Sequence, residues 1–178
     1  MADSSKLVPF ILSWETDKYT NNKKDKGGPT KYGITLATWR RVGYDKNGDG
    51  ILNEEDVKLL TEEDFHRVFK QNYWNACKAD QIQDQSVANM LVDFAYNSGV
   101  SKAVKHLQLV LGITADGIIG NKTLFAINKS NGKRLFEAFK KDRKAYLKRI
   151  AVGDQKGFLN GWLRRLSYIN YDNLKLNE

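Results

Sequence analysis

The N-terminal part of the chain places one acidic side chain between an apolar helical stripe and a polar loop. Apolar residues recur at three- and four-residue spacing from Leu7 to Trp14, which predicts a buried helix face that ends near Glu15. A carboxyl beside Trp14 loses hydration in its charged form, so it can keep a proton and donate it to a leaving oxygen. Cleavage of a glycosidic bond requires such an acid. The competing interpretation is a solvated glutamate at a helix end.

A glycosidase commonly pairs its acid with a second carboxylate, and the distance between the two sets retention or inversion. Asp17 lies two residues after Glu15, so on a continuing helix it would point elsewhere. Asp25 lies farther along the loop, and the loop can return it toward Glu15. We therefore predict Asp25 as the second catalytic residue. A turn-capping aspartate before Gly27 is the competing interpretation.

The loop over residues 16–33 carries residue types that suit a saccharide. Glycines let the backbone approach a bulky sugar, while hydroxyls and a ring offer hydrogen bonds and a stacking face. Turn formation and packing explain the same residues equally simply. The candidates for substrate contact from this pattern are Gly28, Thr30 and Tyr32.

A second cluster of oxygen-bearing residues occupies the stretch DKNGDGILNEED, residues 45–56. Calcium needs six or more oxygens at about 2.3–2.6 Å, which alternate residues on a tight loop with a central glycine provide. The residues at positions 1, 3, 5, 7 and 12 are Asp45, Asn47, Asp49, Ile51 and Asp56. Aspartate at position 12 resembles the dockerin variety of the loop. We predict a structural Ca²⁺ and no catalytic cofactor; the alternative is a metal-free acidic turn.

The run from Trp14 to Thr35 resembles the N-terminal signature of glycoside hydrolase family 108, the lysozyme-like N-acetylmuramidases also labelled secretion activator proteins. That signature has the form E-G-G-Y, a short spacer, and D-x-G-G-x-T-x-x-G-I-T. The matching residues are Glu15, Tyr19, Asp25, Gly27, Gly28, Thr30, Gly33, Ile34 and Thr35. The resemblance implies that Glu15 is the catalytic acid and that Tyr19 contacts the substrate.

The chain departs from this signature beside the proposed acid. Thr16 and Asp17 replace the two glycines of the family, and Tyr19 comes one residue late. The similarity continues over residues 73–99, and it implies that Asp93 and Asn97 also bind substrate. The matching residues there are Tyr73, Trp74, Asp93, Asn97 and Gly99.

A third motif lies in residues 103–127. Its L-Q-x-x-L-G spacing, followed by D-G-x-x-G-x-x-T-x-x-A, is similar to a peptidoglycan-binding motif that the family fuses to its muramidase. The residues that carry it are Leu107, Gln108, Leu111, Gly112, Asp116, Gly117, Gly120, Thr123 and Ala126. Turn formation and helix capping also explain these residues, so the motif is evidence for the fold first.

The elements that must position these groups are mainly helices. The chain of 178 residues has two prolines, one cysteine and 41% hydrophobic residues, which indicates a packed core without disulfides. Apolar stripes predict helices behind Thr61, over 87–98, over 103–111 and from about Lys133 to Ala151, and the spacing of Thr61 and Asp64 resembles a helix cap. We predict a mainly α, lysozyme-like fold with a polar loop or short hairpin after the first helix and an inserted calcium-type loop. The catalytic part would span residues 1–86, and a helical peptidoglycan-binding part 87–178, packed as one unit.

The net charge of +8 favours a polyanionic partner. We predict a hydrolase of the β-1,4 bond between N-acetylmuramic acid and N-acetylglucosamine in bacterial peptidoglycan, acting as a monomer. The alternative is a non-catalytic peptidoglycan-binding or interaction module. Nucleic-acid binding through the basic residues 133–149 rests on charge alone, so no nucleic-acid partner is expected.

The location of the protein follows from its predicted substrate. No stretch of the sequence is long and apolar enough to span a bilayer, and the N-terminus shows no export signal pattern. We therefore expect synthesis in the cytoplasm, followed by release through a holin or another export route to act on the cell wall from the periplasm. A phage or prophage origin fits this expectation.

Overall fold

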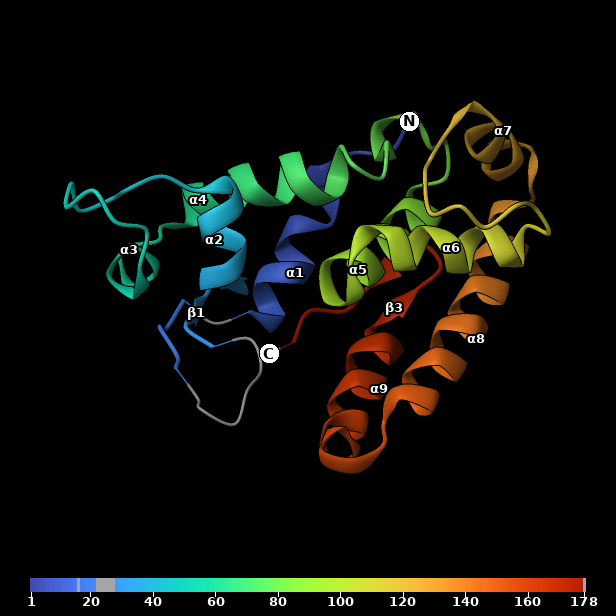
Figure 1. The fold of residues 1–178 in the computed structure, drawn as a ribbon. Helices are drawn as coiled ribbons and strands as arrows, with labels where there is room; N and C mark the ends of the chain where they lie inside the picture. Colours follow the sequence, from blue (N-terminus) through green and yellow to red (C-terminus); the bar gives the residue numbers. More distant parts are fainter. Residues whose placement is uncertain (16, 22–27, 178) are drawn as a thin grey trace.

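The computed structural model describes residues 1–15, 17–21 and 28–177, and these residues are mostly helical (Figure 1). Short 3-10 turns and one π-helical turn join the α-helices, and two small strand pairs complete the fold. In chain order the elements are η1 (Ser4–Lys6), α1 (Val8–Trp14), β1 (Thr30–Lys31), β2 (Ile34–Thr35), α2 (Leu36–Val42), α3 (Glu54–Lys58), α4 (Glu62–Phe69), η2 (Lys70–Trp74), η3 (Ala79–Gln81), α5 (Gln85–Ser98), α6 (Val100–Val110), α7 (Asn121–Lys129), α8 (Gly132–Ile150), η4 (Gly153–Phe158), α9 (Leu159–Tyr168), β3 (Ile169–Asn170) and β4 (Asn173–Leu174).

Side-chain caps fix where several helices begin. At α4, the Thr61 hydroxyl accepts a hydrogen bond from the Asp64 amide, and the Asp64 carboxylate accepts one from the Thr61 amide at 3.0 Å. This reciprocal cap is the arrangement that the sequence indicated there. Asp84 caps α5 and Asn131 caps α8 in the same way, each accepting from an amide three residues later. Such caps contribute about 1 kcal/mol each.

The polar loop after α1 ends in a short hairpin. β1 pairs antiparallel with β2, so that Thr30 lies opposite Thr35 and Lys31 lies opposite Ile34. Between the strands the chain turns at Tyr32 and Gly33, whose φ angles are +53° and +69°. Positive φ is unusual for a tyrosine, and such backbone conformations concentrate at functional sites.

Helix α5 forms the centre of the core, because every residue from Ser86 to Ala95 is buried. Helices α6 and α8 pack against it (Figure 1). The Phe94 ring of α5 lies 5.9 Å from the ring of Phe139 and 5.3 Å from that of Tyr146, both on α8. Each fully buried large apolar side chain contributes about 1.5–3 kcal/mol. The helix is continuous through residues 86 and 87, where the sequence suggested a division into two parts.

The end of the chain returns to the first helix. The Asn177 amide donates to the Ser13 hydroxyl at 3.1 Å, and its side-chain amide donates to the Ser13 carbonyl at 3.2 Å. Figure 1 shows the C-terminus beside the end of α1. The C-terminal segment therefore packs next to Glu15. Within the described ranges, no helix combines the length and apolar character that crossing a membrane would need.

Candidate active site

Glu15 is the first residue after α1, and it lines a cavity of about 580 Å³. Its extended backbone (φ −99°, ψ 139°) ends the helix. The side chain is 18% exposed, so the carboxyl is half-sheltered while still facing the cavity. The described residues that line this cavity are Leu12, Ser13, Trp14, Glu15, Asp17, Tyr32, Glu62 and Asn177.

The carboxyl of Glu15 is held by an arginine from the other end of the chain. The Arg165 Nη1 atom, on α9, donates to Glu15 Oε1 at 2.8 Å. The same guanidinium donates through Nη2 and Nε to Asp93 Oδ1 at 2.8 and 3.0 Å. On the far side, Arg143 Nη2 of α8 lies 2.7 Å from Asp93 Oδ2. The carboxyl groups of Glu15 and Asp93 and the two guanidiniums thus form one connected ion-pair chain.

Burial makes this ion-pair chain rigid. The side chains of Asp93 and Arg143 are 0% and 3% exposed, and that of Arg165 is 10% exposed. Burial by itself would raise the pKa of Asp93, but the guanidiniums of Arg165 and Arg143 outweigh it and hold the pKa below its usual value. Asp93 therefore carries its negative charge in the core, and Arg165 stays fixed toward Glu15.

The hairpin turn presses against the other oxygen of Glu15. A Cβ atom placed on Gly33 would lie 2.7 Å from Glu15 Oε2 and would also overlap the Tyr96 hydroxyl, so only glycine fits here. The Tyr96 hydroxyl donates to the Tyr32 carbonyl at 2.9 Å. Burial raises the pKa of Tyr96 well above its usual value, and the Glu15 carboxylate adds to the effect. Tyr96 is therefore a neutral hydrogen-bond donor that anchors the turn beside the acid.

The loop residues predicted to contact substrate occupy different places. Tyr32 lines the cavity of Glu15. Gly28 has φ +64°, with open space around its Cα, and Thr30 is paired in the hairpin. Tyr19 is turned toward α3, where its hydroxyl donates to Glu54 Oε2 at 2.8 Å. Of these four residues, only Tyr32 is brought to the cavity.

The two substrate-binding candidates on α5 also differ. Asp93 is fully buried and bound to two arginines, so its carboxylate cannot reach a sugar in the cavity; its contact with Arg165 makes it a support for Glu15 instead. Asn97 is exposed, and its side-chain amide donates to the Asp93 carbonyl at 2.7 Å. Asn97 lines a small pocket together with Arg165, so it lies beside the site.

Asp25, the predicted second carboxylate, lies outside the described residues. Two other acids line the same cavity as Glu15, namely Asp17 and Glu62. The Glu62 side chain is 59% exposed and lies 3.4 Å from the ring of His66. Sequence reasoning did not single out Glu62 because a glutamate in the first turn of a helix has an ordinary explanation in the helix dipole.

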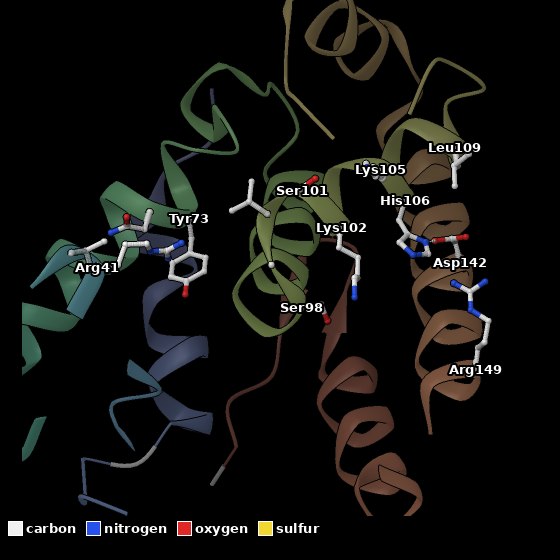
Figure 2. A pocket seen from close by; sticks show the side chains of 14 residues that line it. Arg41, Tyr73, Ser98, Ser101, Lys102, Lys105, His106, Leu109, Asp142 and Arg149 are labelled. Atoms are coloured by element: carbon white, nitrogen blue, oxygen red, sulfur yellow. Dashed lines mark hydrogen bonds and ion pairs between the residues drawn. The ribbon is translucent and has the colours of Figure 1, made fainter. Parts of the chain in front are cut away.

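A second, larger cavity lies along α6, and residues of α8 also line it (Figure 2). Its volume is about 1090 Å³. Arg41 and Tyr73 line it from the N-terminal half, while Lys102 and Arg149 line it from α6 and α8. Its position beside Tyr73 brings it close to the first site, since Tyr73 and Tyr96 have ring centroids 4.9 Å apart.

The calcium-type loop 45–56 turns back on itself through hydrogen bonds from its own backbone. Asp45 accepts from the amides of Gly48 and Gly50, each at 2.7 Å, and Asp49 accepts from the amide of Ile51 at 2.8 Å. Gly50 has φ +80°, which suits the glycine position of such a loop. The loop backbone is therefore folded around the side chains of positions 1 and 5.

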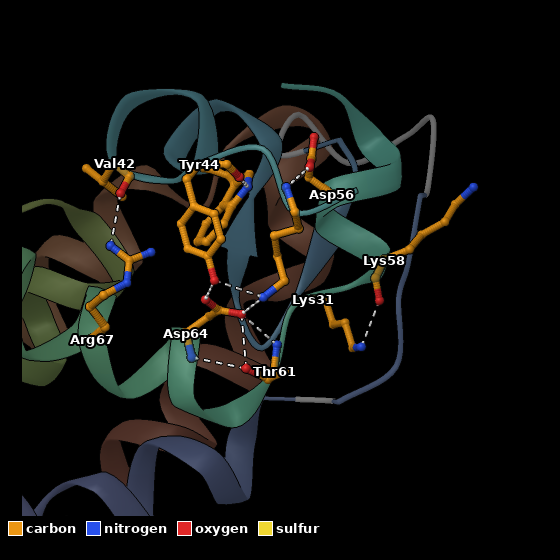
Figure 3. Close-up of polar contacts among 10 residues, drawn as sticks. Lys31, Val42, Tyr44, Asp56, Lys58, Thr61, Asp64 and Arg67 are labelled. Atoms are coloured by element: carbon orange, nitrogen blue, oxygen red, sulfur yellow. Dashed lines mark hydrogen bonds and ion pairs between the residues drawn. The ribbon is translucent and has the colours of Figure 1, made fainter. Parts of the chain in front are cut away.

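Asp56, the last residue of that loop, also has a structural role. It is fully buried, and its carboxylate accepts from the amide of Lys46 at 2.6 Å (Figure 3). It also accepts from the amide of Asn53 at 2.9 Å, which caps α3. Within residues 1–15, 17–21 and 28–177, no three His, Cys, Asp or Glu side chains converge as a metal site would need.

The L-Q-x-x-L-G and D-G motif stabilises the connection between α6 and α7. The side-chain amide of Gln108 donates to Asp116 Oδ1 at 2.8 Å and to Thr123 Oγ1 at 3.1 Å, and its oxygen accepts from the Gly117 amide at 2.8 Å. Gln108 is 1% exposed. These residues hold the loop together from inside, so the motif has an architectural role.

Comparison with known proteins identifies the class of this molecule. Residues 8–99 match the family described as Glycosyl hydrolase 108, and residues 102–167 match the one described as Predicted Peptidoglycan domain. The chain is similar to a solved structure described as that of Brucella abortus SagA, with 34% sequence identity and a TM-score of 0.80. The match covers 98% of this chain and 95% of the SagA chain. No curated protein matches the chain.

These matches define a glycosidase joined to a peptidoglycan domain. The chain belongs to the glycosyl hydrolase 108 family. The predictions of a mainly helical, lysozyme-like fold and of a muramidase-type peptidoglycan hydrolase are confirmed at this level. Arg165 and two cations of the larger cavity, Lys102 and Arg149, fall inside the peptidoglycan-domain match, whereas Glu15 falls inside the hydrolase match.

Proposed function

We propose that Glu15 is the general acid that cleaves the β-1,4 bond between N-acetylmuramic acid and N-acetylglucosamine. One observation carries this assignment: Glu15 lines the 580 Å³ cavity while Arg165 holds its Oε1 atom at 2.8 Å. The contact fixes the carboxyl group in one orientation. The guanidinium would also stabilise the negative charge that the carboxyl acquires as its proton passes to the leaving oxygen.

The second carboxylate of the reaction is proposed to be Asp25. The sequence supports this choice, because Asp25 lies on the polar loop that ends in the hairpin beside Glu15. Glu62 is the competing candidate, since it lines the cavity. Either one could serve as a nucleophile or as a base for water, depending on its distance from the scissile bond.

The test is the release of reducing ends from purified sacculi by wild-type protein and by Glu15→Gln. We expect the variant to lose at least a thousandfold in kcat while keeping the wild-type unfolding midpoint, because the amide preserves the shape but cannot donate an acid proton. Asp25→Asn and Glu62→Gln identify the second group in the same assay. A folded Glu15→Gln protein that still cleaves sacculi would reject the assignment.

The alternative remains a peptidoglycan-binding module without turnover, because Thr16 and Asp17 replace the glycines of the resembled signature. Wild-type protein that sediments with sacculi but releases neither reducing ends nor muropeptides would establish this alternative. Mass analysis of the soluble products separates the two cases. It also shows whether the new reducing end is N-acetylmuramic acid.

We further propose that the protein reaches the periplasm through a holin or another export route, as a phage or prophage product would, and acts there as a monomer. The chemistry of the substrate supports the location, because peptidoglycan lies outside the cytoplasmic membrane. The protein would be expressed in a Gram-negative host with and without a holin. Lysis that occurs only in the presence of the holin would support this route. Light scattering of the purified protein measures its oligomeric state.

A structural calcium ion at residues 45–56 is a separate proposal. It is supported by the register of Asp45, Asn47, Asp49 and Asp56 and by the left-handed conformation of Gly50. To bind the ion, the carboxylates would have to exchange some of their backbone hydrogen bonds for calcium contacts. The ion would stiffen the insertion between α2 and α3 and would take no part in catalysis.

A further inference from the structure

The larger cavity has a pronounced positive character. Arg41, Lys102, Lys105 and Arg149 all line it, and all four are exposed. Among the described residues of its lining, the one carboxylate is Asp142, and that group is bound to the ring of His106 at 2.5 Å. Two arginines and two lysines therefore face the cleft, and the one carboxylate among its described lining residues is paired with His106.

Two of these cations, Lys102 and Arg149, each lie near the ring of Tyr146. Lys102 Nζ of α6 lies 5.4 Å from the centroid of Tyr146, and the guanidinium carbon of Arg149 of α8 lies 5.9 Å from the same centroid. Figure 2 shows Lys102 and Arg149 on neighbouring helices at the cleft. Both side chains are exposed, so their charged ends remain available to an anionic ligand in the cleft.

The cleft is linked to the site of Glu15 through two residues. Tyr73 lines the cleft, and its ring centroid lies 4.9 Å from that of Tyr96, whose hydroxyl lies with the Glu15 carboxyl against Gly33. Ser98 lines both the cleft and the small pocket that contains Arg165. The cleft therefore lies close to the site of Glu15.

The chemistry of peptidoglycan indicates which part of it the cleft would take. Its amino sugars are N-acetylated and uncharged, so they offer nothing to a group of cations. Its stem peptides carry free carboxylates. A volume of about 1090 Å³ is large enough for a short peptide, since pockets of roughly 300–1,000 Å³ hold drug-sized ligands.

We propose that this cleft binds the carboxylates of the peptidoglycan stem peptide, with Lys102 and Arg149 as the principal contacts. The proposal rests on the function proposed above, because it assigns the peptide part of the same substrate to the cleft. It makes the enzyme selective for glycan strands that carry charged stems over strands whose stems are neutral.

The experiment compares the Lys102→Gln/Arg149→Gln double variant with wild type on two substrates. One is soluble, uncross-linked peptidoglycan strands; the other is the same strands with their carboxylates converted to amides by carbodiimide coupling. On native strands we expect the double variant to lose about tenfold in kcat/KM, as the loss of two exposed charge pairs implies. Wild type should lose about the same factor on amidated strands, and there the variant and wild type should be equal.

The matched control is Lys133→Gln/Lys141→Gln, which removes the same charge from exposed positions of α8 outside the cleft. It should retain wild-type kcat/KM on both substrates. Equal losses for the two double variants would indicate general attraction to an anionic wall and would overturn the proposal. The proposal is also overturned if the cleft variant loses equally on native and amidated strands, or loses nothing.

A binding measurement separates this proposal from the hydrolase assignment. Disaccharide tetrapeptide, titrated calorimetrically into wild-type protein, should bind about tenfold more tightly than its carboxyl-amidated form, and the cleft variant should abolish that difference. If wild type cleaves neither strand, the hydrolase assignment fails and the calorimetry alone decides the role of the cleft. A DNA duplex that displaces the muropeptide at equal concentration, with affinity that falls in the cleft variant, would assign the cleft to nucleic acid and reject the proposal.

Discussion

Arg165 Nη1 lies 2.8 Å from Glu15 Oε1, although 150 residues separate the two in the chain. The acid belongs to the segment that matches the hydrolase family, and the arginine to the segment that matches the peptidoglycan domain. The guanidinium is fixed in turn by Asp93 of the central helix. The peptidoglycan-domain segment therefore contributes Arg165 to the site of Glu15, which lies in the hydrolase segment.

The first prediction concerns this contact. Arg165→Ala leaves Asp93 buried with only Arg143 as its partner, so we expect the free energy of unfolding to fall by about 3–5 kcal/mol. Glu15 also loses the group that orients it, and kcat should fall about a hundredfold at a temperature where the variant is folded. Urea unfolding and reducing-end release measure the two effects.

Arg134→Ala is the matched control for that variant. Arg134 is an arginine of α8 with an exposed side chain, and it does not line the cavity of Glu15. Its loss should cost under about 1 kcal/mol and leave kcat within a few-fold of wild type. If the two alanine variants behaved alike, the buried ion-pair chain would have no special role.

The second prediction is a pH dependence at Asp93. Because the two guanidiniums hold its native pKa below the unfolded value of about 3.9, its contribution to stability is present above that value and is lost as the pH falls through the lower native pKa. Asp93→Asn should therefore be less stable than wild type by about 3–5 kcal/mol at pH 7. That gap should narrow as the pH falls below about 3.9.

Unfolding free energies of Asp93→Asn and wild type, measured from pH 7 down to pH 3, check this prediction. Asp154→Asn removes an exposed carboxylate from the η4 turn and serves as the control. Its difference from wild type should stay within about 0.5 kcal/mol across the range. A gap for Asp93→Asn that stays constant with pH would contradict the charged state assigned to this residue.

The helices were predictable because their signals are local. The apolar stripe that indicated a helix from about Lys133 to Ala151 corresponds to α8, Gly132–Ile150. Thr61 and Asp64 form the cap that their spacing indicated. The glycines, proline and asparagines after the first helix indicated a polar loop or a short hairpin, and β1 and β2 form a short hairpin there. Each of these features depends on residues within a few positions of one another.

The support of the acid was not predictable, because it is built from distant residues. Nothing near Arg165 in the sequence separates it from Arg164, yet one is buried in the ion-pair chain and the other is exposed. Asp93 was interpreted as a substrate contact for the same reason. A buried aspartate and a surface aspartate look alike until the helices that surround them are placed.

The third prediction tests the calcium proposal. Calcium in excess over its dissociation constant should raise the unfolding midpoint of wild type, and a hundredfold excess corresponds to about 2.7 kcal/mol. Asp45→Asn/Asp49→Asn should lose this shift, because two charges leave the ligand set while an oxygen stays at each position. Glu55→Gln, at a position of the loop that does not ligate, should keep it. Absence of both a calcium-dependent shift and calorimetric binding in wild type would reject the site.

The fourth prediction uses two glycines with the same backbone conformation. Gly33 and Gly112 both have φ +69°, so alanine at either position is strained by about 1–2 kcal/mol. A Cβ at Gly112 meets open space, whereas at Gly33 it would lie 2.7 Å from Glu15 Oε2. We therefore expect Gly33→Ala to lose more stability than Gly112→Ala, because it adds steric overlap to the same backbone strain, and to lose far more activity.

Urea unfolding of both variants measures the effect on stability, and reducing-end release measures the effect of moving the Glu15 carboxyl. Gly112→Ala should keep kcat near the wild-type value. Gly33→Ala should lose about a hundredfold, because its methyl group moves the Glu15 carboxyl by the fraction of an ångström to which proton transfer is sensitive. If Gly33→Ala were as stable and as active as Gly112→Ala, the turn at Gly33 would have no part in positioning the Glu15 carboxyl.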